Sequence, residues 1–258
     1  MAIPSVISHS ASAPPAADRF ANLTWSVRRV TWGLVSAAAL LIGLHLLSEA
    51  VAELWGEPEQ LRYFFSLRGE ANPGALYSTL QLLFCAMLLT AITRSELGGR
   101  HRWYWGILAA GFYYLALDEG ARIHELLSPL VQTMTGRSSG ITRQGWVIPG
   151  IAVVAVVGLS YLRFIFLLPR RTALQFAIGG AIYVSGLIGV EILSSLYMEA
   201  LRAVEGSSCN LTRDCGFGHS VMIAVEEGME MIGITIFANA LMHTCLTACP
   251  KVCIRLDR

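Results

Sequence analysis

Charged residues are scarce in this chain of 258 residues: Asp, Glu, Lys and Arg make up 14% of it, whereas soluble domains average about 25%. The net charge is +1 and no basic stripe is present, so nothing in the sequence indicates a nucleic-acid partner. Hydrophobic residues make up 54%, and several apolar runs approach or exceed the roughly 18 residues that cross a bilayer. The composition excludes an ordinary soluble domain and predicts one polytopic membrane domain whose main partner is the lipid bilayer.

Several motifs are missing as well. Residues 1–23 are rich in Ala, Ser and Pro without an apolar core, so we expect residues 1–28 to be a disordered cytoplasmic tail and not a signal peptide. Phosphate-binding loops, zinc-protease motifs and Ser-His-Asp signatures are absent. Cysteine is uncommon too, with six in the chain. Of these, Cys209 and Cys215 are near enough in sequence to pair in an oxidising compartment.

The apolar runs predict six membrane spans, at residues 30–53, 75–95, 103–127, 146–168, 172–199 and 219–245. If the N-terminus is inside, the inner segments hold eleven Lys and Arg residues and the outer segments hold six. Positive residues favour the cytoplasmic side, so this bias sets the orientation. We therefore expect an all-α fold, a six-helix transmembrane bundle with both termini cytoplasmic. The six-span domain covers 29–247, and 248–258 is a second cytoplasmic tail.

Acids and histidines gather at one end of the apolar runs, and that end faces the same side of the membrane each time. A carboxylate inside a span costs about 2.5–3.5 kcal/mol, so such groups usually face the bundle interior and mark a function. The pattern predicts one polar layer in the outer half of the bundle. Its main members are His45 and Glu49; Asp118, Glu119, Arg122, His124 and Glu125; Glu191; and His219, Glu226, Glu227 and Glu230.

In the third span, helical spacing puts Asp118, Arg122 and Glu125 on one face. Glu119 lies at the edge of that face, and His124 points well away from it. One interpretation is a structural ion pair between Asp118 and Arg122, four residues apart. That pair leaves the other acids unexplained, so a ligand or proton site is the second interpretation.

In the sixth span, Glu226, Glu230 and His219 share a face, and Glu227 flanks them. Glu230 would lie about 16 Å along the helix from His219, near the middle of the bilayer. Carboxylates at that depth need a proton, a cation or an Arg partner. The alternative is a set of protonated or Arg-paired glutamates that only pack the bundle.

Carboxylates together with imidazoles are the ligands that suit iron, manganese or zinc. The sequence thus predicts a divalent metal site with ligands Glu49, Asp118, Glu125, His219, Glu226 and Glu230. Arg122 would orient a carboxylate or bind an anionic substrate group, and Glu119 or Glu227 would transfer protons. Soluble di-iron bundles use Glu-x-x-His, a motif that this sequence lacks. The resemblance to them is therefore in ligand types and not in motif.

Two acidic motifs carry a further resemblance. Leu117-Asp118-Glu119 followed by His124-Glu125, and Glu226-Glu227-x-x-Glu230-Met231, resemble an uncharacterised group of bacterial polytopic membrane proteins. The resemblance covers those two helices and the layout of the spans. It implies a multi-pass protein of the bacterial inner membrane and carries no activity with it.

These patterns lead to one functional hypothesis and two alternatives. The first is a metal-dependent oxidoreductase or hydrolase that acts on a lipid or quinone-like substrate. The second is a proton or cation pathway in which the same acids relay charge, which requires a polar route to the inner face. The third is a non-catalytic subunit of a larger membrane complex. In that case other membrane subunits are its partners, and its acids serve helix packing alone.

Overall fold

The computed structural model describes residues 26–56, 59–69, 72–95, 99, 101–136, 144–205 and 216–248. Within these ranges the secondary structure is helical and includes no strand, as the all-α prediction requires. Most of the two expected tails, together with Cys209 and Cys215, lies outside the described residues.

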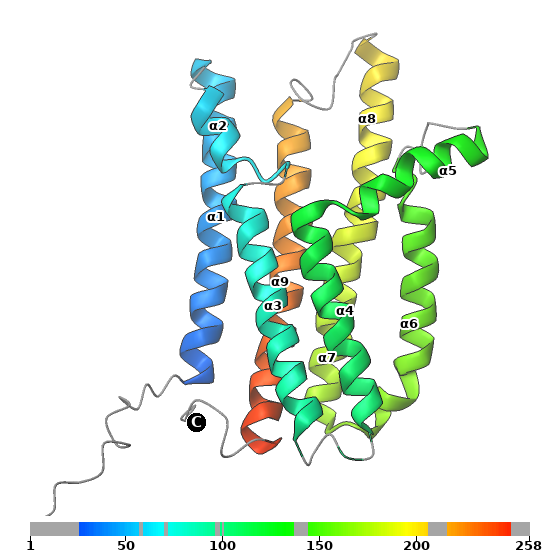
Figure 1. Cartoon of the computed structure of the whole chain (residues 1–258). Helices are drawn as coiled ribbons and strands as arrows, with labels where there is room; N and C mark the ends of the chain where they lie inside the picture. The colour runs from blue at the N-terminus through cyan, green and yellow to red at the C-terminus, as the bar shows by residue number, and fades with distance from the viewer. Residues whose placement is uncertain are drawn as a thin grey trace, which may run out of the picture.

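The long helices stand side by side, and each runs antiparallel to the one before it along the chain (Figure 1). Two short helices, α2 and α5, lie at the end of the bundle where α1 and α4 finish (Figure 1). The start of α1 and the end of α9 lie together at the opposite end. The bounds are α1 Val27–Trp55, α2 Glu59–Phe65, α3 Pro73–Arg94, α4 Arg102–Ala121, α5 Leu127–Thr135, α6 Val147–Leu167, α7 Arg170–Val184, α8 Glu191–Glu205 and α9 Gly216–Ala248.

Four helical segments are long and apolar enough to cross a membrane: Val27–Trp55, Pro73–Arg94, Val147–Leu167 and Arg170–Leu201. They coincide with the first, second, fourth and fifth expected spans. The fifth combines α7 and α8, which a π-helical segment, Ser185–Val190, joins into one rod. The protein is therefore a helical membrane protein. Helices α4 and α9 take the places of the third and sixth expected spans but are not among the four.

The expected third span is wrong at its outer end. Helix α4 stops at Ala121 because Arg122 adopts a left-handed backbone, with φ of 50°, while its N–H donates to the Asp118 carbonyl. The chain then turns through a short 3-10 segment, His124–Leu126, into α5. Asp118, Arg122 and Glu125 consequently do not share the helical face that their spacing predicted.

Local sequence signals explain where two of the long helices begin. Ser26 caps α1 by accepting a hydrogen bond from the backbone N–H of Arg29 at 3.2 Å. Asn72 caps α3 in the same way, accepting from Ala75 at 2.9 Å, and Pro73 occupies the first helical position, where its missing N–H costs nothing.

The apolar core lies mainly in the half of the bundle away from the acids. Helix α9 is central to it and packs against α1, α3 and α7. The core is built from Leu82, Cys85, Leu89 and Ile92 of α3, Trp105 and Phe112 of α4, Phe164 of α6, Phe176 of α7, and Ile234, Ala238 and Leu241 of α9. The acids of α9 are thereby held against neighbouring helices whose positions the core fixes.

Glycines bring α7 and α9 into very close contact. A Cβ added at Gly233 would lie 2.8 Å from the Gly179 carbonyl oxygen and 2.9 Å from the Tyr183 Cβ. A Cβ at Gly179 would in turn lie 3.0 Å from the Gly233 carbonyl oxygen. Small residues at such positions let helix backbones approach within a membrane, where packing takes over from the hydrophobic effect.

We predict that Gly233→Ala destabilises the protein by about 1–3 kcal/mol, because the new methyl group meets backbone that cannot move aside cheaply. The matched control is Gly43→Ala in α1, where nothing lies within 4 Å of an added Cβ. Thermal unfolding of the purified protein in detergent should show a lower Tm for the first variant and an equal or higher Tm for the second. Equal Tm values for the two variants would contradict the close contact.

Candidate functional site

Five glutamates from three helices form an acidic cluster inside the bundle. The carboxyl group of Glu226 lies close enough to those of Glu191, Glu227 and Glu230 to interact with them electrostatically. Glu227 and Glu230 each interact with Glu191 and with Glu119 of α4. The structure therefore brings together Glu226 and Glu230, two of the three predicted ligands of α9, with both predicted proton-transfer residues, and it adds Glu191.

The cluster lies where full ionisation is costly. Glu230 is buried, with 8% of its surface exposed, and the other members are only partly exposed. Like charges at short range in a low-dielectric interior repel strongly. The cluster must hold protons, or a cation must take their place.

A π-helical segment positions Glu191 in this cluster. Ser185–Val190 ends directly before Glu191, so the irregular turn sets the direction in which that side chain leaves the rod. Gly186 lies within the segment and touches α9: an added Cβ would be 2.9 Å from the Glu226 carbonyl oxygen and 3.3 Å from the Glu230 Cγ. Segments of this kind occur often at functional sites, because they re-aim side chains without breaking the helix.

Two polar side chains of α3 face the same region. The amide nitrogen of Gln81 donates to the Thr235 hydroxyl at 2.9 Å and lies 3.5 Å from the carbonyl of Met231, the residue after Glu230. The Gln81 Oε1 and the Ser78 Oγ are buried and have no hydrogen-bond partner among the described residues. Buried polar atoms of this kind usually meet water or an ion, so the region next to Glu230 suits a polar ligand.

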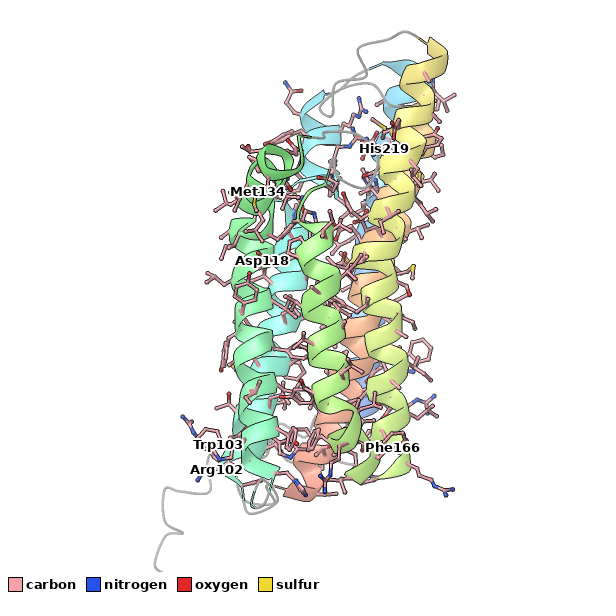
Figure 2. All side chains as sticks on the ribbon, turned by 90° about the vertical axis from the view of Figure 1, so that its right-hand side faces the viewer. Arg102, Trp103, Asp118, Met134, Phe166 and His219 are labelled. Atoms are coloured by element: carbon pink, nitrogen blue, oxygen red, sulfur yellow. The ribbon has the colours of Figure 1, made fainter. Side chains whose placement is uncertain are left out.

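Tyr183 and Asp118 border the cluster on a second side. Tyr183 of α7 interacts electrostatically with Glu230, Glu119 and Asp118. Asp118 lies in the upper part of the bundle, at the opposite end from Arg102 and Trp103 (Figure 2). Its carboxylate accepts from the His124 backbone N–H at 2.7 Å and contacts the His124 Nδ1 at 2.8 Å.

The expected positions of His124 and Arg122 are wrong for one reason. Because α4 ends at Ala121, the chain turns back and brings His124 onto Asp118, whereas a continuous helix would point it away. Arg122 pairs with Glu125 in place of Asp118, and both of those side chains are more than two-fifths exposed. Glu125 is therefore engaged at the surface, apart from the buried carboxylates.

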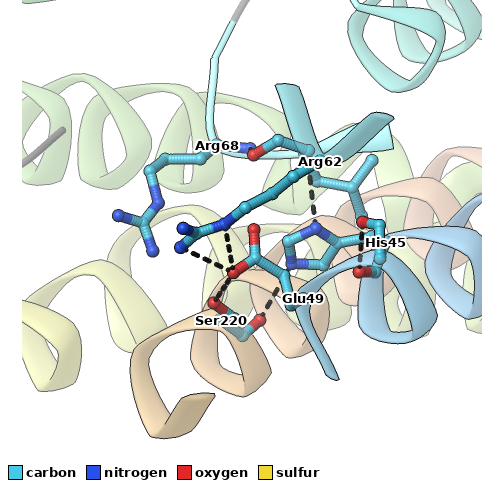
Figure 3. A network of polar contacts seen from close by, with 8 residues as sticks. His45, Glu49, Arg62, Arg68 and Ser220 are labelled. Atoms are coloured by element: carbon cyan, nitrogen blue, oxygen red, sulfur yellow. Dashed lines mark hydrogen bonds and ion pairs between the residues drawn. The ribbon is translucent and has the colours of Figure 1, made fainter. Parts of the chain in front are cut away.

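A second polar network surrounds His45 where α1, α9 and the segment after α2 meet (Figure 3). The Leu67 N–H donates to the His45 Nδ1 at 3.3 Å, and the Nε2 lies 3.1 Å from the Ser220 carbonyl oxygen. Those contacts fit one neutral tautomer, with the proton on Nε2. The ring is fully buried, and both of its nitrogens are committed to the backbone.

Glu49 belongs to this network and not to the acidic cluster. Its Oε2 accepts from Arg62 Nε at 3.1 Å and from the Ser220 hydroxyl at 2.9 Å, and it is 3.0 Å from Arg62 Nη2. Arg68 also lies close to Glu49. Burial lowers the pKa of the Arg68 guanidinium, and nearby Glu49 opposes that shift. Arg62 is therefore a second basic residue beside the predicted polar layer, in addition to Arg122. Helical periodicity could not reveal Arg62, because it lies on a separate helix.

His219 lies near the start of α9 (Figure 2) and is buried. Its neighbour Ser220 contacts both His45 and Glu49, so this part of α9 is next to the His45 network. Glu226 is seven residues further on, about 10 Å along the helix axis. The predicted ligands thus occupy two places along α9.

No group of three or more His, Cys, Asp or Glu side chains in the described ranges already has the arrangement of a metal site. The metal therefore stays a prediction. A cation at the acidic cluster would require the carboxyl groups to turn toward one point and to lose any protons that they hold.

We predict that Arg62→Gln destabilises the protein by about 1–3 kcal/mol, because it leaves the carboxylate of Glu49 buried without its charged partner. Adding Glu49→Gln should recover part of that loss, since the remaining amide needs no cation. Tm values of the two single variants and the double variant form the test. Additive losses would show that the Arg62–Glu49 contact contributes nothing.

Comparison with known proteins gives a family without an assigned activity. Residues 33–245 match the model of a family described as Domain of unknown function (DUF8692). No curated protein and no solved structure matches the chain significantly. The matched region includes the acidic cluster as well as His45, Glu49 and Arg62. Because the match covers most of the sequence, the chain belongs to the DUF8692 family.

Proposed function

We propose that the acidic cluster is a membrane-embedded site that binds a divalent metal ion in exchange for protons. The observation that carries this proposal is the meeting of five glutamates from α4, α8 and α9 inside an apolar bundle. Arg62 pairs with Glu49, and Arg122 pairs with Glu125. A multivalent cation is the simplest counter-charge for such a group.

The contacts favour a ligand set that differs from the one predicted by spacing. Glu226 and Glu230 stay in the set, joined by Glu191, with Glu119 and Glu227 beside them as ligands or proton carriers. Glu49 and Glu125 leave it because their carboxylates are engaged by arginines. Sites rich in carboxylate oxygen favour manganese or iron over zinc, which prefers nitrogen and sulfur.

The activity that we propose for this site is oxidation–reduction or hydrolysis on a lipid or quinone-like substrate within the membrane. Glu119 and Glu227 lie beside the other carboxylates, where a proton-transfer group must be. Arg122 is exposed at the end of α4, so an anionic substrate group could meet it at the rim of the bundle.

A proton pathway is the second candidate, and two observations favour it. The carboxyl groups of Glu191 and Glu226 lie close together, an arrangement that favours a proton on one of them. Polar side chains also continue along α9 below Glu230: Thr235 bonds to Gln81, and Asn239 bridges Gln175 and Thr31 at 2.8 Å on each side. These groups supply part of the polar route to the inner face that a proton pathway requires.

For topology, we propose six spans with both termini in the cytoplasm of a bacterium and the acidic cluster in the outer half of the inner membrane. Three observations support this: the alternating directions of the long helices, the shared end of α1 and α9, and the positions of α4 and α9 inside the bundle (Figure 1).

For the metal, we predict that protein purified from membranes without chelator holds about one manganese or iron ion per chain, and that Glu226→Gln and Glu230→Gln each lose it. The matched control Glu125→Gln should retain the metal, because Glu125 pairs with Arg122 at the surface. Elemental analysis gives the ratio. Metal-free wild-type protein that moves protons in vesicles would favour the pathway. Metal-free protein with no such activity would favour a non-catalytic subunit.

For the topology, we predict that single cysteines at positions 56, 140 and 207, in a cysteine-free background, react with a membrane-impermeant thiol reagent in intact cells. A cysteine at position 103, at the other end of the bundle, should react only after the cells are opened. The reverse labelling pattern would place the acidic cluster on the cytoplasmic side.

A further inference from the structure

Helix α6 is exposed on every side along its middle. Residues 151–160 are all exposed except Val154, which is partly buried. Ten residues make more than two helical turns, so their side chains point in every direction, including toward the bundle. Figure 2 shows α6 in front of the space between α4 and the α7–α8 rod. The side of α6 that faces the bundle is therefore open over this stretch.

Both ends of α6 are nevertheless fixed to the bundle. At the lower end, the ring of Phe164 stacks on Tyr104 with centroids 4.8 Å apart, and the Tyr161 hydroxyl donates to the Tyr104 carbonyl at 2.8 Å. At the upper end, Trp146 is buried with its ring 4.8 Å from that of His124, which Asp118 holds. The helix thus cannot close onto α4 by a simple tilt.

The facing surface of α4 is open at the same height. Gly111 lies seven residues after Tyr104 and seven before Asp118, so it is on the α4 face that meets α6 at both ends. No heavy atom lies within 4 Å of a Cβ built at Gly111. On α6, exposed Val157 lies seven residues before Phe164, so it is on the face that meets α4 at the lower end. Gly111 and Val157 mark the α4–α6 groove, which the two aromatic contacts close below and above.

We propose that the α4–α6 groove binds one acyl chain of a bilayer lipid. Helix α6 is the most apolar of the four candidate spans, so the groove opens onto the hydrocarbon of the membrane. Its walls include exposed Tyr114 of α4 and Val157 of α6. Water finds few hydrogen-bond partners in a space with such walls, whereas a hydrocarbon chain makes favourable dispersion contacts with them. The open stretch of α6 is about 14 Å long, which suits a chain and not a globular partner.

The upper end of the groove leads toward the acidic cluster. Asp118 closes that end through His124, and Tyr183 interacts with both Asp118 and Glu230. A lipid whose chain occupies the groove would have its polar end near these groups. The lipid is then the substrate class of the acidic cluster, a step that rests on the proposed function. Chain binding itself does not depend on a metal.

Filling the groove tests the proposal. Gly111→Leu and Val157→Trp place larger side chains in the open space from opposite walls, and Gly43→Leu is the matched control on an exposed α1 position with nothing within 4 Å. Native mass spectrometry of the full chain in detergent, titrated with dioleoyl phosphatidylglycerol, measures binding. Wild type and Gly43→Leu should bind one lipid saturably, and each groove variant should bind at least tenfold more weakly at an unchanged Tm.

Three results would overturn the proposal. They are equal lipid binding by all four proteins, saturable binding of the isoprenoid alcohol farnesol in place of the phospholipid, and a stable dimer that groove variants abolish. Glu230→Gln separates this inference from the proposed function. If this variant loses the metal but binds the lipid as wild type does, lipid binding in the groove does not depend on the acidic cluster. If wild-type protein holds no metal but still binds the lipid, the lipid-binding groove is supported and the metal site is contradicted.

Discussion

The cost of placing carboxylates in the interior of a helical bundle governs the half of this structure that holds the acids. Glu226, Glu227 and Glu230 lie on α9, the central helix, where neighbouring helices leave little water to solvate them. Their positions depend on the close contact between α7 and α9, because Gly179 and Gly233 let the two backbones meet. That contact also brings the π-helical segment against α9 and places Glu191 beside Glu226.

The protein balances buried acids in two different ways. Arg62 balances the charge of Glu49, and the Ser220 hydroxyl donates a hydrogen bond to the same carboxylate. The neutral ring of His45 accepts a hydrogen bond from the adjoining backbone. That network joins α1, α9 and the segment after α2, which is a structural task. The acidic cluster instead sets carboxyl groups against one another. Such an arrangement lowers the stability of the fold unless a proton or cation is bound. The composition of the cluster therefore best supports a role in binding a proton or a cation. The α4–α6 groove adds an apolar approach to the same region.

Much of the fold follows from hydrophobic runs, and four of the expected spans coincide with apolar helices. The clustering of Glu226, Glu227, Glu230 and Glu119 could also be predicted, because helical spacing fixes which face an acid occupies. The end of α4 could not be predicted, since hydropathy does not reveal a left-handed residue such as Arg122. Nor was the Arg62–Glu49 pair, which depends on how α2 folds back onto α1. Pairing across helices is a property of packing, and periodicity along one helix does not contain it.

Infrared difference spectroscopy on addition of Mn²⁺ to the metal-depleted protein tests the central claim most directly. If the acidic cluster exchanges protons for a cation, the carbonyl band of protonated carboxyl groups should fall and the carboxylate bands should rise. Glu230→Gln should greatly reduce both changes. An unchanged protonated-carboxyl band in wild-type protein at saturating Mn²⁺ would contradict it.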